Sequence, residues 1–173
     1  PEHGSRASTG ILDDLLARVI VLESKGVRTA LVSLDVWGLN RQIASDLKAA
    51  VAYAADIEST SVWLTTTGNA TSPPLWRDES QYANYRAFLP EQVAGATRMA
   101  VGVLEPASMG STGTLLPDVS TFAEGPGRPG NQALFVMAIN RADGSGIARV
   151  INFACPATIL GSGTQWTADY PGY

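Results

Sequence analysis

Hydrophobic and polar residues alternate over several stretches of this chain, and this alternation predicts β-strands. Residues 17–23 and 28–35 are separated by a short Ser-Lys-Gly turn and predict an antiparallel hairpin. Residues 134–140 and 147–155 flank an Asp-Gly turn and predict a second hairpin. Two further short strands are expected at residues 61–67 and 109–116.

Helical spacing is clearest at residues 40–55, where Ile43, Leu47 and Val51 fall on one face and Asn40 suits the N-cap. In this helix the polar residues lie away from that face. The spacing therefore predicts an amphipathic helix packed on a sheet.

Residues 81–104 also have a helical pattern. Pro90 interrupts it and is expected to occupy the first turn of a separate helix. The buried face of that helix is expected to carry Val93, Ala96, Ala100 and either Val103 or Leu104. Three aromatic residues either contribute to the packing of this helix or line a lipid pocket: Tyr82, Tyr85 and Phe88.

The predicted order is β-β-α-β-α-β-β-β, an α/β fold with a mixed β-sheet and crossover helices on at least one face. A right-handed crossover makes strands 28–35 and 61–67 parallel. The loop at residues 68–74 then leaves the carboxyl end of a strand, where open α/β sheets usually bind ligands.

Composition narrows the classes of function. A length of 173 residues predicts one domain covering residues 1–173, and 45% hydrophobic residues with a mean hydropathy of +0.06 are ordinary for a globular protein. The net charge of −4 without a basic stripe argues against a nucleic-acid partner. No apolar run is long enough for a transmembrane segment. The chain starts at Pro1, which suggests a processed or excised piece.

Few residues are available for nucleophilic or metal chemistry. The chain has one cysteine, Cys155, which excludes an internal disulfide, and one histidine, His3. Most zinc sites and most Ser/His or Cys/His machinery need more histidines. Asp13 and Asp14 either accept hydrogen bonds at a site or remain solvated.

Several segments resemble the N-terminal domain of the neutral/alkaline non-lysosomal ceramidase family. Gly-Ile-Leu-Asp-Asp-Leu-Leu-Ala-Arg-Val-Ile-Val-Leu-Glu at residues 10–23 is similar to its opening strand, and Thr-Ala-Leu-Val-Ser-Leu-Asp-Val-Trp-Gly at 29–38 to its second. Residues 143–155 and 167–172 are similar to two further family segments. The resemblance implies a zinc-dependent amidase fold that cleaves the N-acyl bond of ceramide or a related lipid amide.

The chain departs from this family at the positions of the metal ligands. The family has a Thr-His-Thr-His-Ser-Gly-Pro type loop after the third strand, whereas this chain has Gly-Asn-Ala-Thr-Ser-Pro-Pro at 68–74, with Asn69 and Thr71 at the histidine positions. Another family histidine follows the Asn-Phe-Ala-Cys strand, where this chain has Pro156. The remaining family ligands lie later in a longer domain, so residues 1–173 are expected to be a truncated piece of it.

The replacements change the metal chemistry. An Asn amide and a Thr hydroxyl are weak ligands for zinc, and proline offers only its carbonyl. Asp35 and Asp169 add carboxylates, but these without imidazole suit calcium or magnesium at best. We therefore expect no cofactor in this chain, in contrast to the zinc of the family it resembles.

Three functional hypotheses remain open. The chain is a degenerate, metal-free ceramidase-like scaffold, either a pseudoenzyme or one part of an assembly that a protein partner completes. Alternatively, it is a hydrolase that uses Cys155 as nucleophile and His3 as base, although a buried structural cysteine is the simpler interpretation. Thirdly, it is a non-catalytic module that binds a ligand or a partner.

Candidate pocket residues follow from these hypotheses: Asn69, Thr71, Ser72, Cys155, Asp169 and Tyr170. The ligand is expected to be a lipid amide or another small molecule. Trp37, Trp76 and Trp166 are candidates for a binding surface, whereas Trp63 is expected in the core. Asn69-Ala-Thr71 is also a pattern for N-glycosylation, and the resemblance favours a secreted protein.

Overall fold

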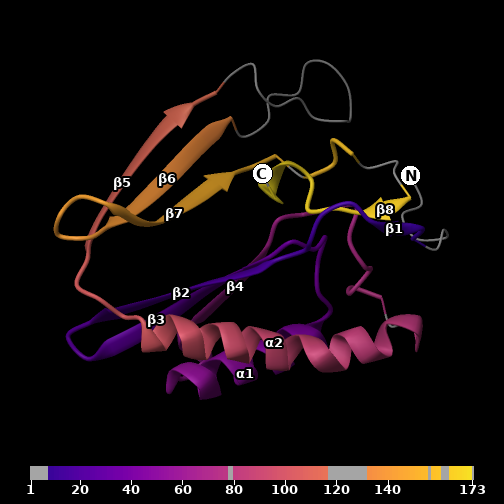
Figure 1. The fold of residues 1–173 in the computed structure, drawn as a ribbon, viewed down its shortest axis with the longest axis horizontal. Helices are drawn as coiled ribbons and strands as arrows, with labels where there is room; N and C mark the ends of the chain where they lie inside the picture. Colours follow the sequence, from indigo (N-terminus) through magenta and orange to yellow (C-terminus); the bar gives the residue numbers. More distant parts are fainter. Residues whose placement is uncertain (1–7, 78–79, 117–131, 156, 161–163, 173) are drawn as a thin grey trace. The chain divides into compact units, whose positions relative to one another are not determined.

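The computed structural model describes residues 8–77, 80–116, 132–155, 157–160 and 164–172 (Figure 1). By its contacts the chain divides into two compact units, Pro1–Leu104 with Pro156–Tyr173, and Glu105–Cys155. Each unit is described by itself. The single domain expected for residues 1–173 stays a prediction.

The first unit contains a three-stranded mixed sheet in the order β2-β3-β4. Strands β2 (Ala17–Ser24) and β3 (Val27–Leu34) are antiparallel, and β4 (Val62–Thr66) is parallel to β3. Helices α1 (Arg41–Ala55) and α2 (Ala83–Gly102) lie on one face of this sheet (Figure 1). The predicted hairpin, crossover and N-terminal helix are confirmed.

Alternation along the strands explains which face the helices cover. Val32 and Leu34 of β3 and Val62 of β4 point into the core and are buried. Helix α1 contributes Leu47 and Val51 to the same cluster. The side chain of Asn40 accepts a hydrogen bond from the Ile43 N–H at 2.9 Å and caps this helix, as predicted.

The predicted break at Pro90 is wrong. Helix α2 runs from Ala83 to Gly102 without interruption and holds Pro90 in its interior. A proline removes one intrahelical hydrogen bond, and burial of Leu89 and Val93 on either side of it offsets that loss. Val103 and Leu104 lie beyond the end of the helix and are 74% and 39% exposed, so neither belongs to its buried face.

The expected core position of Trp63 is also wrong. Trp63 lies on β4 and is 71% exposed, because it points to the sheet face opposite the helices. The buried neighbour Val62 occupies the helix-facing position instead. The presence of a tryptophan in a short strand therefore did not indicate which face of the sheet its side chain occupies.

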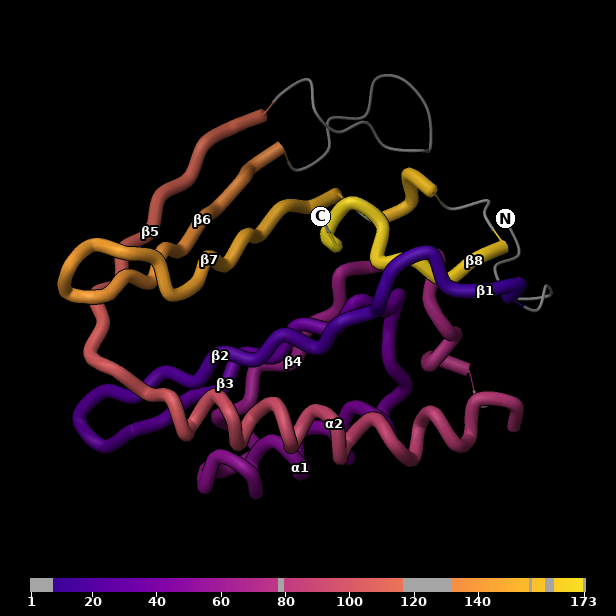
Figure 2. Tube along the Cα trace, viewed as in Figure 1, coloured from indigo at the N-terminus to yellow at the C-terminus, as the bar shows by residue number. Residues whose placement is uncertain are grey.

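Two very short strands were not predicted. β1 (Gly10–Ile11) and β8 (Gln165–Trp166) form a parallel pair that joins the two ends of the first unit (Figure 2). Single-turn 3-10 helices occupy Ser59–Ser61, Ser80–Tyr82 and Tyr170–Gly172. No helix in the described ranges is long and apolar enough to cross a bilayer.

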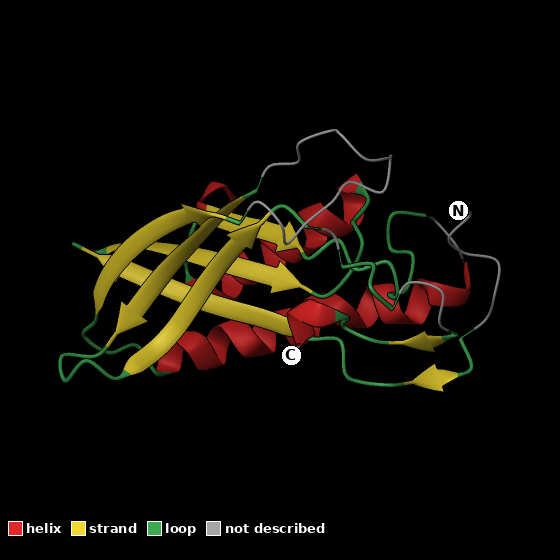
Figure 3. Ribbon diagram, turned by 90° about the horizontal axis from the view of Figure 1, so that it is seen from above, coloured by secondary structure: helices red, strands yellow, loops and turns green. Residues whose placement is uncertain are grey.

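The second unit is a three-stranded antiparallel sheet (Figure 3). Its strands, in the order in which they pair, are β5 (Ser108–Leu115), β6 (Ala133–Asn140) and β7 (Gly146–Phe153). The hairpin between β6 and β7 turns at Gly144, which has a positive φ of 86°. Apart from the two short strands β1 and β8, the predicted order β-β-α-β-α-β-β-β is confirmed, and so is the α/β class.

Candidate functional site

The loop that follows β4 lies at the carboxyl end of the two parallel strands, as the sequence predicts. The Thr67 N–H donates to the Leu34 carbonyl at 3.0 Å, and the Asn69 N–H to the Val36 carbonyl at 3.3 Å. The Ala70 N–H then donates to the carbonyl of Ala157 at 3.0 Å. The loop therefore joins the end of the sheet to the C-terminal part of the chain.

Asn69 is the central side chain of this site. It is completely buried, and its Nδ2 donates to the carbonyls of Asp35 at 3.1 Å and Thr167 at 2.6 Å. Its Oδ1 lies 3.0 Å from the Thr71 backbone nitrogen and 2.8 Å from Thr71 Oγ1, and it accepts hydrogen bonds from this residue. Both amide protons are therefore engaged, and Oδ1 accepts from the Thr71 N–H and lies within hydrogen-bond distance of the Thr71 hydroxyl.

Thr71 and Ser72 complete the loop. Thr71 Oγ1 lies 2.9 Å from the Thr167 carbonyl, and the Thr167 N–H donates to the Thr71 carbonyl. Ser72 Oγ accepts from the Trp37 N–H at 2.9 Å and donates to the Asn69 carbonyl at 2.9 Å. These side chains satisfy buried backbone groups, which would otherwise be costly.

Residues 167–169 form the other side of the site. Asp13 accepts hydrogen bonds from the Thr167 hydroxyl and the Ala168 N–H. Asp169 is completely buried with a positive φ of 56°, and its carboxylate accepts from the N–H groups of Leu160 at 2.8 Å and Tyr170 at 2.7 Å. The segment is therefore held by side chains that come from both ends of the first unit.

A partly buried ion pair between Arg18 and Asp35 lies next to this segment. Asp35 accepts hydrogen bonds from Arg18 Nη1, with its two carboxylate oxygens at 2.7 and 2.8 Å, and from the Leu16 N–H at 3.0 Å. Asp35 is buried, while the Arg18 side chain is 40% exposed. Arg18 Nη2 also lies 3.5 Å from the Pro171 carbonyl, which links the pair to the C-terminal residues.

The structure brings together most of the residues expected in the pocket. Asn69, Thr71 and Ser72 lie in one hydrogen-bonded group with Thr167, and Asp169 follows two residues later. Tyr170 is next along the chain and is 36% exposed. Their functional role stays a prediction.

The structure does not place the other predicted residues relative to this group. Cys155 belongs to the second unit. Pro156 and His3 lie outside the described residues. The structure therefore does not describe whether His3 contacts the Cys155 thiol. The hypothesis of a Cys155 nucleophile with a His3 base therefore stays a prediction.

Sequence reasoning missed Thr167 and Arg18, and it left Asp13 undecided. The structure shows Asp13 as a hydrogen-bond acceptor. The two adjacent aspartates at residues 13 and 14 were the sequence signal that could have identified Asp13 as a hydrogen-bond acceptor. Arg18 sits in an alternating strand, and its pairing with Asp35 follows from the antiparallel hairpin only when the strand register is known.

The donor groups at this site do not fit a zinc centre. The Asn69 amide is already held by hydrogen bonds to the protein, and the carboxylates of Asp35 and Asp169 already accept hydrogen bonds from backbone or guanidinium groups. Within the described ranges no group of three or more His, Cys, Asp or Glu side chains is placed to hold a metal ion. We therefore assign no chemical step to zinc at these residues.

Aromatic residues lie beside the loop. The rings of Trp37 and Trp76 have centroids 6.3 Å apart with an interplanar angle of 54°, and the Arg77 guanidinium lies 6.0 Å from the Trp76 ring centroid. Tyr85 packs against the core, and burial raises the pKa of its hydroxyl. Phe88 is 57% exposed.

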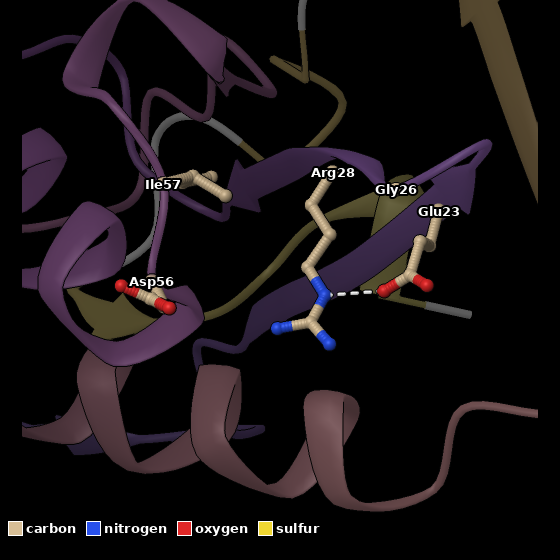
Figure 4. Close-up of a pocket in the computed structure, with 5 residues that line it drawn as sticks. All are labelled: Glu23, Gly26, Arg28, Asp56 and Ile57. Atoms are coloured by element: carbon tan, nitrogen blue, oxygen red, sulfur yellow. Dashed lines mark hydrogen bonds and ion pairs between the residues drawn. The ribbon is translucent and has the colours of Figure 1, made fainter.

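A surface hollow of about 330 Å³ lies at the opposite end of β3 (Figure 4). Its lining residues are Glu23, Gly26, Arg28, Asp56 and Ile57. Arg28 pairs with Glu23 and lies 3.4 Å from the Ala55 carbonyl, at the C-terminus of α1. Arg28 thus caps a helix end, and its charge complements the helix dipole.

No family model matches this chain, and no curated protein matches it. Solved structures of ceramidases are similar to it, among them the following two. A ceramidase solved in complex with C2 shares 18% identity at a TM-score of 0.67, and the alignment covers 99% of this chain and 30% of that one. The neutral ceramidase from Pseudomonas aeruginosa shares 14% identity at a TM-score of 0.62, over 86% of this chain and 27% of that one.

The fold is therefore that of a ceramidase-like α/β protein. The resemblance seen in the sequence, to the neutral ceramidases, is confirmed at the level of the fold. The chain spans less than a third of the length of either solved protein.

Proposed function

We propose that this chain is a metal-free, ceramidase-like scaffold that binds a lipid amide and needs further polypeptide for hydrolysis. The observation that carries the proposal is the saturated side chain of Asn69, at a position that the resemblance assigns to a histidine. A residue that uses every polar group to hold the fold has none left for a metal or a substrate.

An apolar rim around residues 166–171 supports a lipid ligand. We define this rim as the exposed aliphatic residues Ile11, Leu12, Leu16, Ile159 and Leu160. Backbone hydrogen bonds tie it to the site: the Leu12 N–H donates to the Trp166 carbonyl and the Leu160 N–H to Asp169. We take these exposed side chains as the surface that contacts the lipid chain, because contiguous exposed apolar patches are typical of interaction surfaces.

Binding and hydrolysis are tested separately on the purified chain. We expect co-sedimentation with phosphatidylcholine vesicles only when they contain ceramide, and we expect Ile159→Asp to weaken it about tenfold. Tyr53→Asp is the matched control, because Tyr53 is 88% exposed on α1. Equal binding by vesicles without ceramide would contradict a lipid-amide ligand.

The proposal that this chain holds no metal is tested by zinc analysis together with turnover of a short-chain ceramide. We expect zinc far below one ion per chain and no release of fatty acid. Stoichiometric zinc accompanied by hydrolysis would refute the proposal.

A non-catalytic module that binds a protein or another ligand is the alternative. The pair of Trp37 and Trp76 with Arg77 favours it, because aromatic and arginine side chains dominate many binding interfaces. In that case tryptophan fluorescence changes on binding, and Trp76→Ala removes the change while vesicle binding is unaffected.

A further inference from the structure

Strand β5 forms the edge of the sheet in the second unit, and its outer side carries no partner strand among the described residues. All eight of its residues are exposed. The strand contains no charged residue and no proline, which are the usual devices that prevent edge strands from pairing. The opposite edge strand, β7, carries Arg149.

The register of the sheet identifies which backbone groups face outward. The Leu116 N–H donates to the Gln132 carbonyl at 2.8 Å, which continues the β5–β6 ladder by one hydrogen-bonded pair. Because such pairs alternate along antiparallel strands, the even-numbered residues of β5 bond to β6. The N–H and C=O groups of Met109, Ser111, Gly113 and Leu115 therefore face the open edge.

This pattern is complementary to itself. When two copies of β5 run antiparallel about a two-fold axis at Thr112, every outward residue meets an outward residue. Met109 then lies opposite Leu115 of the second copy, and Ser111 lies opposite its Gly113. Met109 and Leu115 are 62% and 69% exposed in one chain, so the pairing covers apolar surface that is otherwise solvated.

Gly113 of this strand fits the same arrangement. The ring of Phe135 lies over Gly113, because a Cβ at this position would come within 2.7 Å of Phe135 Cδ1. Phe135 remains 55% exposed. In the pair of strands, this ring lies next to Ser111 of the second copy and extends the apolar strip made by Met109 and Leu115.

We propose that β5 is a self-association edge, at which a second copy of this chain pairs antiparallel about Thr112. The occupant is a second copy because an uncharged edge does not repel itself and because the register places Met109 against Leu115. A single strand pair buries less surface than the ~1,000 Å² of a stable interface, so the dimer forms and dissociates with concentration. This inference does not depend on the proposed function.

Charge at the two-fold axis provides the test. In sedimentation velocity we expect the purified chain to change from monomer to dimer as its concentration rises. Thr112→Lys and Thr112→Glu each place like charges opposite one another and should weaken the dimer at least about tenfold. An equimolar mixture of the two variants should restore dimerisation, because it pairs lysine with glutamate.

Asn152→Lys is the matched control, since it adds the same charge at an exposed position on the opposite edge. It should leave the dimer unchanged, and circular dichroism should show all variants folded. A monomer at every concentration, a Thr112→Lys variant that still dimerises, or a mixture without recovery would each overturn the proposal. So would slow hydrogen exchange at Met109, Ser111 and Gly113 in a monomer, which would indicate pairing with another segment.

Discussion

The side-chain amide of Asn69 donates a hydrogen bond of 2.6 Å to the carbonyl of Thr167, which lies 98 residues further along the chain. This contact ties the loop after β4 to the C-terminal segment inside the protein. It also explains why an asparagine is tolerated at a completely buried position, since all its polar groups have partners.

Replacing Asn69 by alanine should therefore destabilise the fold strongly. Asn69→Ala removes two donated hydrogen bonds and the acceptor of the Thr71 N–H, and it leaves buried carbonyls without donors. We expect a loss of roughly 2–4 kcal/mol in the free energy of unfolding, measured by urea denaturation. Asn152→Ala, at an exposed position, should change it by less than about 0.5 kcal/mol. Equal effects of the two variants would show that the buried network contributes nothing.

Two of the ion pairs, Arg18 with Asp35 and Arg141 with Glu105, should differ in their contribution to stability. Asp35→Ala removes the buried acceptor of the Leu16 N–H and of the half-exposed Arg18 guanidinium, and we expect a loss of about 1–2 kcal/mol. Glu105→Ala breaks the pair of Glu105 with Arg141, whose side chains are 39% and 42% exposed, and should cost less than about 1 kcal/mol. Thermal unfolding of both variants in the same buffer measures the difference. Equal losses for the two variants would show that the burial of Asp35 does not matter.

Two glycines should respond to alanine with opposite signs. A Cβ at Gly172 would come within 2.6 Å of the buried Cβ of Ala168, so Gly172→Ala should destabilise the C-terminal segment by about 1–3 kcal/mol. At Gly95 of α2 no atom lies within 4 Å of the new methyl group, and Gly95→Ala should stabilise the helix by up to about 1 kcal/mol. Amide exchange at Thr167 and Ala168 separates local fraying from global unfolding.

Alkaline pH should reveal the burial of Tyr85. Burial raises the pKa of its hydroxyl above the value of about 10 in an unfolded chain. The stabilising contribution is therefore fully present below about pH 10 and is lost as the pH rises through the raised pKa. Urea denaturation between about pH 8 and 11 should show a steeper loss of stability for the native chain than for Tyr85→Phe. Parallel curves for the two proteins would contradict this assignment.

The elements of the fold were predictable because the signals are local. Alternation in β3 and the spacing of Ile43, Leu47 and Val51 in α1 each follow from the period of one element. Pro90 was misjudged because tertiary packing of Leu89 and Val93 offsets a local preference. Trp63 was misjudged because its strand lies at the edge of the sheet, which only the topology reveals.

The site was predictable in its location but not in its bonding. A loop at the carboxyl end of a parallel strand follows from the order of elements, and the loop carries Asn69 and Thr71 as expected. The partners of Asn69 are backbone carbonyls of Asp35 and Thr167, which any residue could supply. No sequence pattern marks a backbone acceptor, so the role of Asn69 in holding the fold emerges only from the structure.

The burial of Asn69 bears on how this protein can be produced. Asn69-Ala-Thr71 is a pattern that oligosaccharyltransferase accepts, yet the folded chain leaves the asparagine no room and no unbonded nitrogen for a sugar. A glycan attached before folding would not fit in the interior of the protein. It would prevent the loop after β4 from packing against Thr167. A eukaryotic secretory host would then yield two populations, an unmodified chain that folds and a glycosylated chain that the quality-control machinery retains.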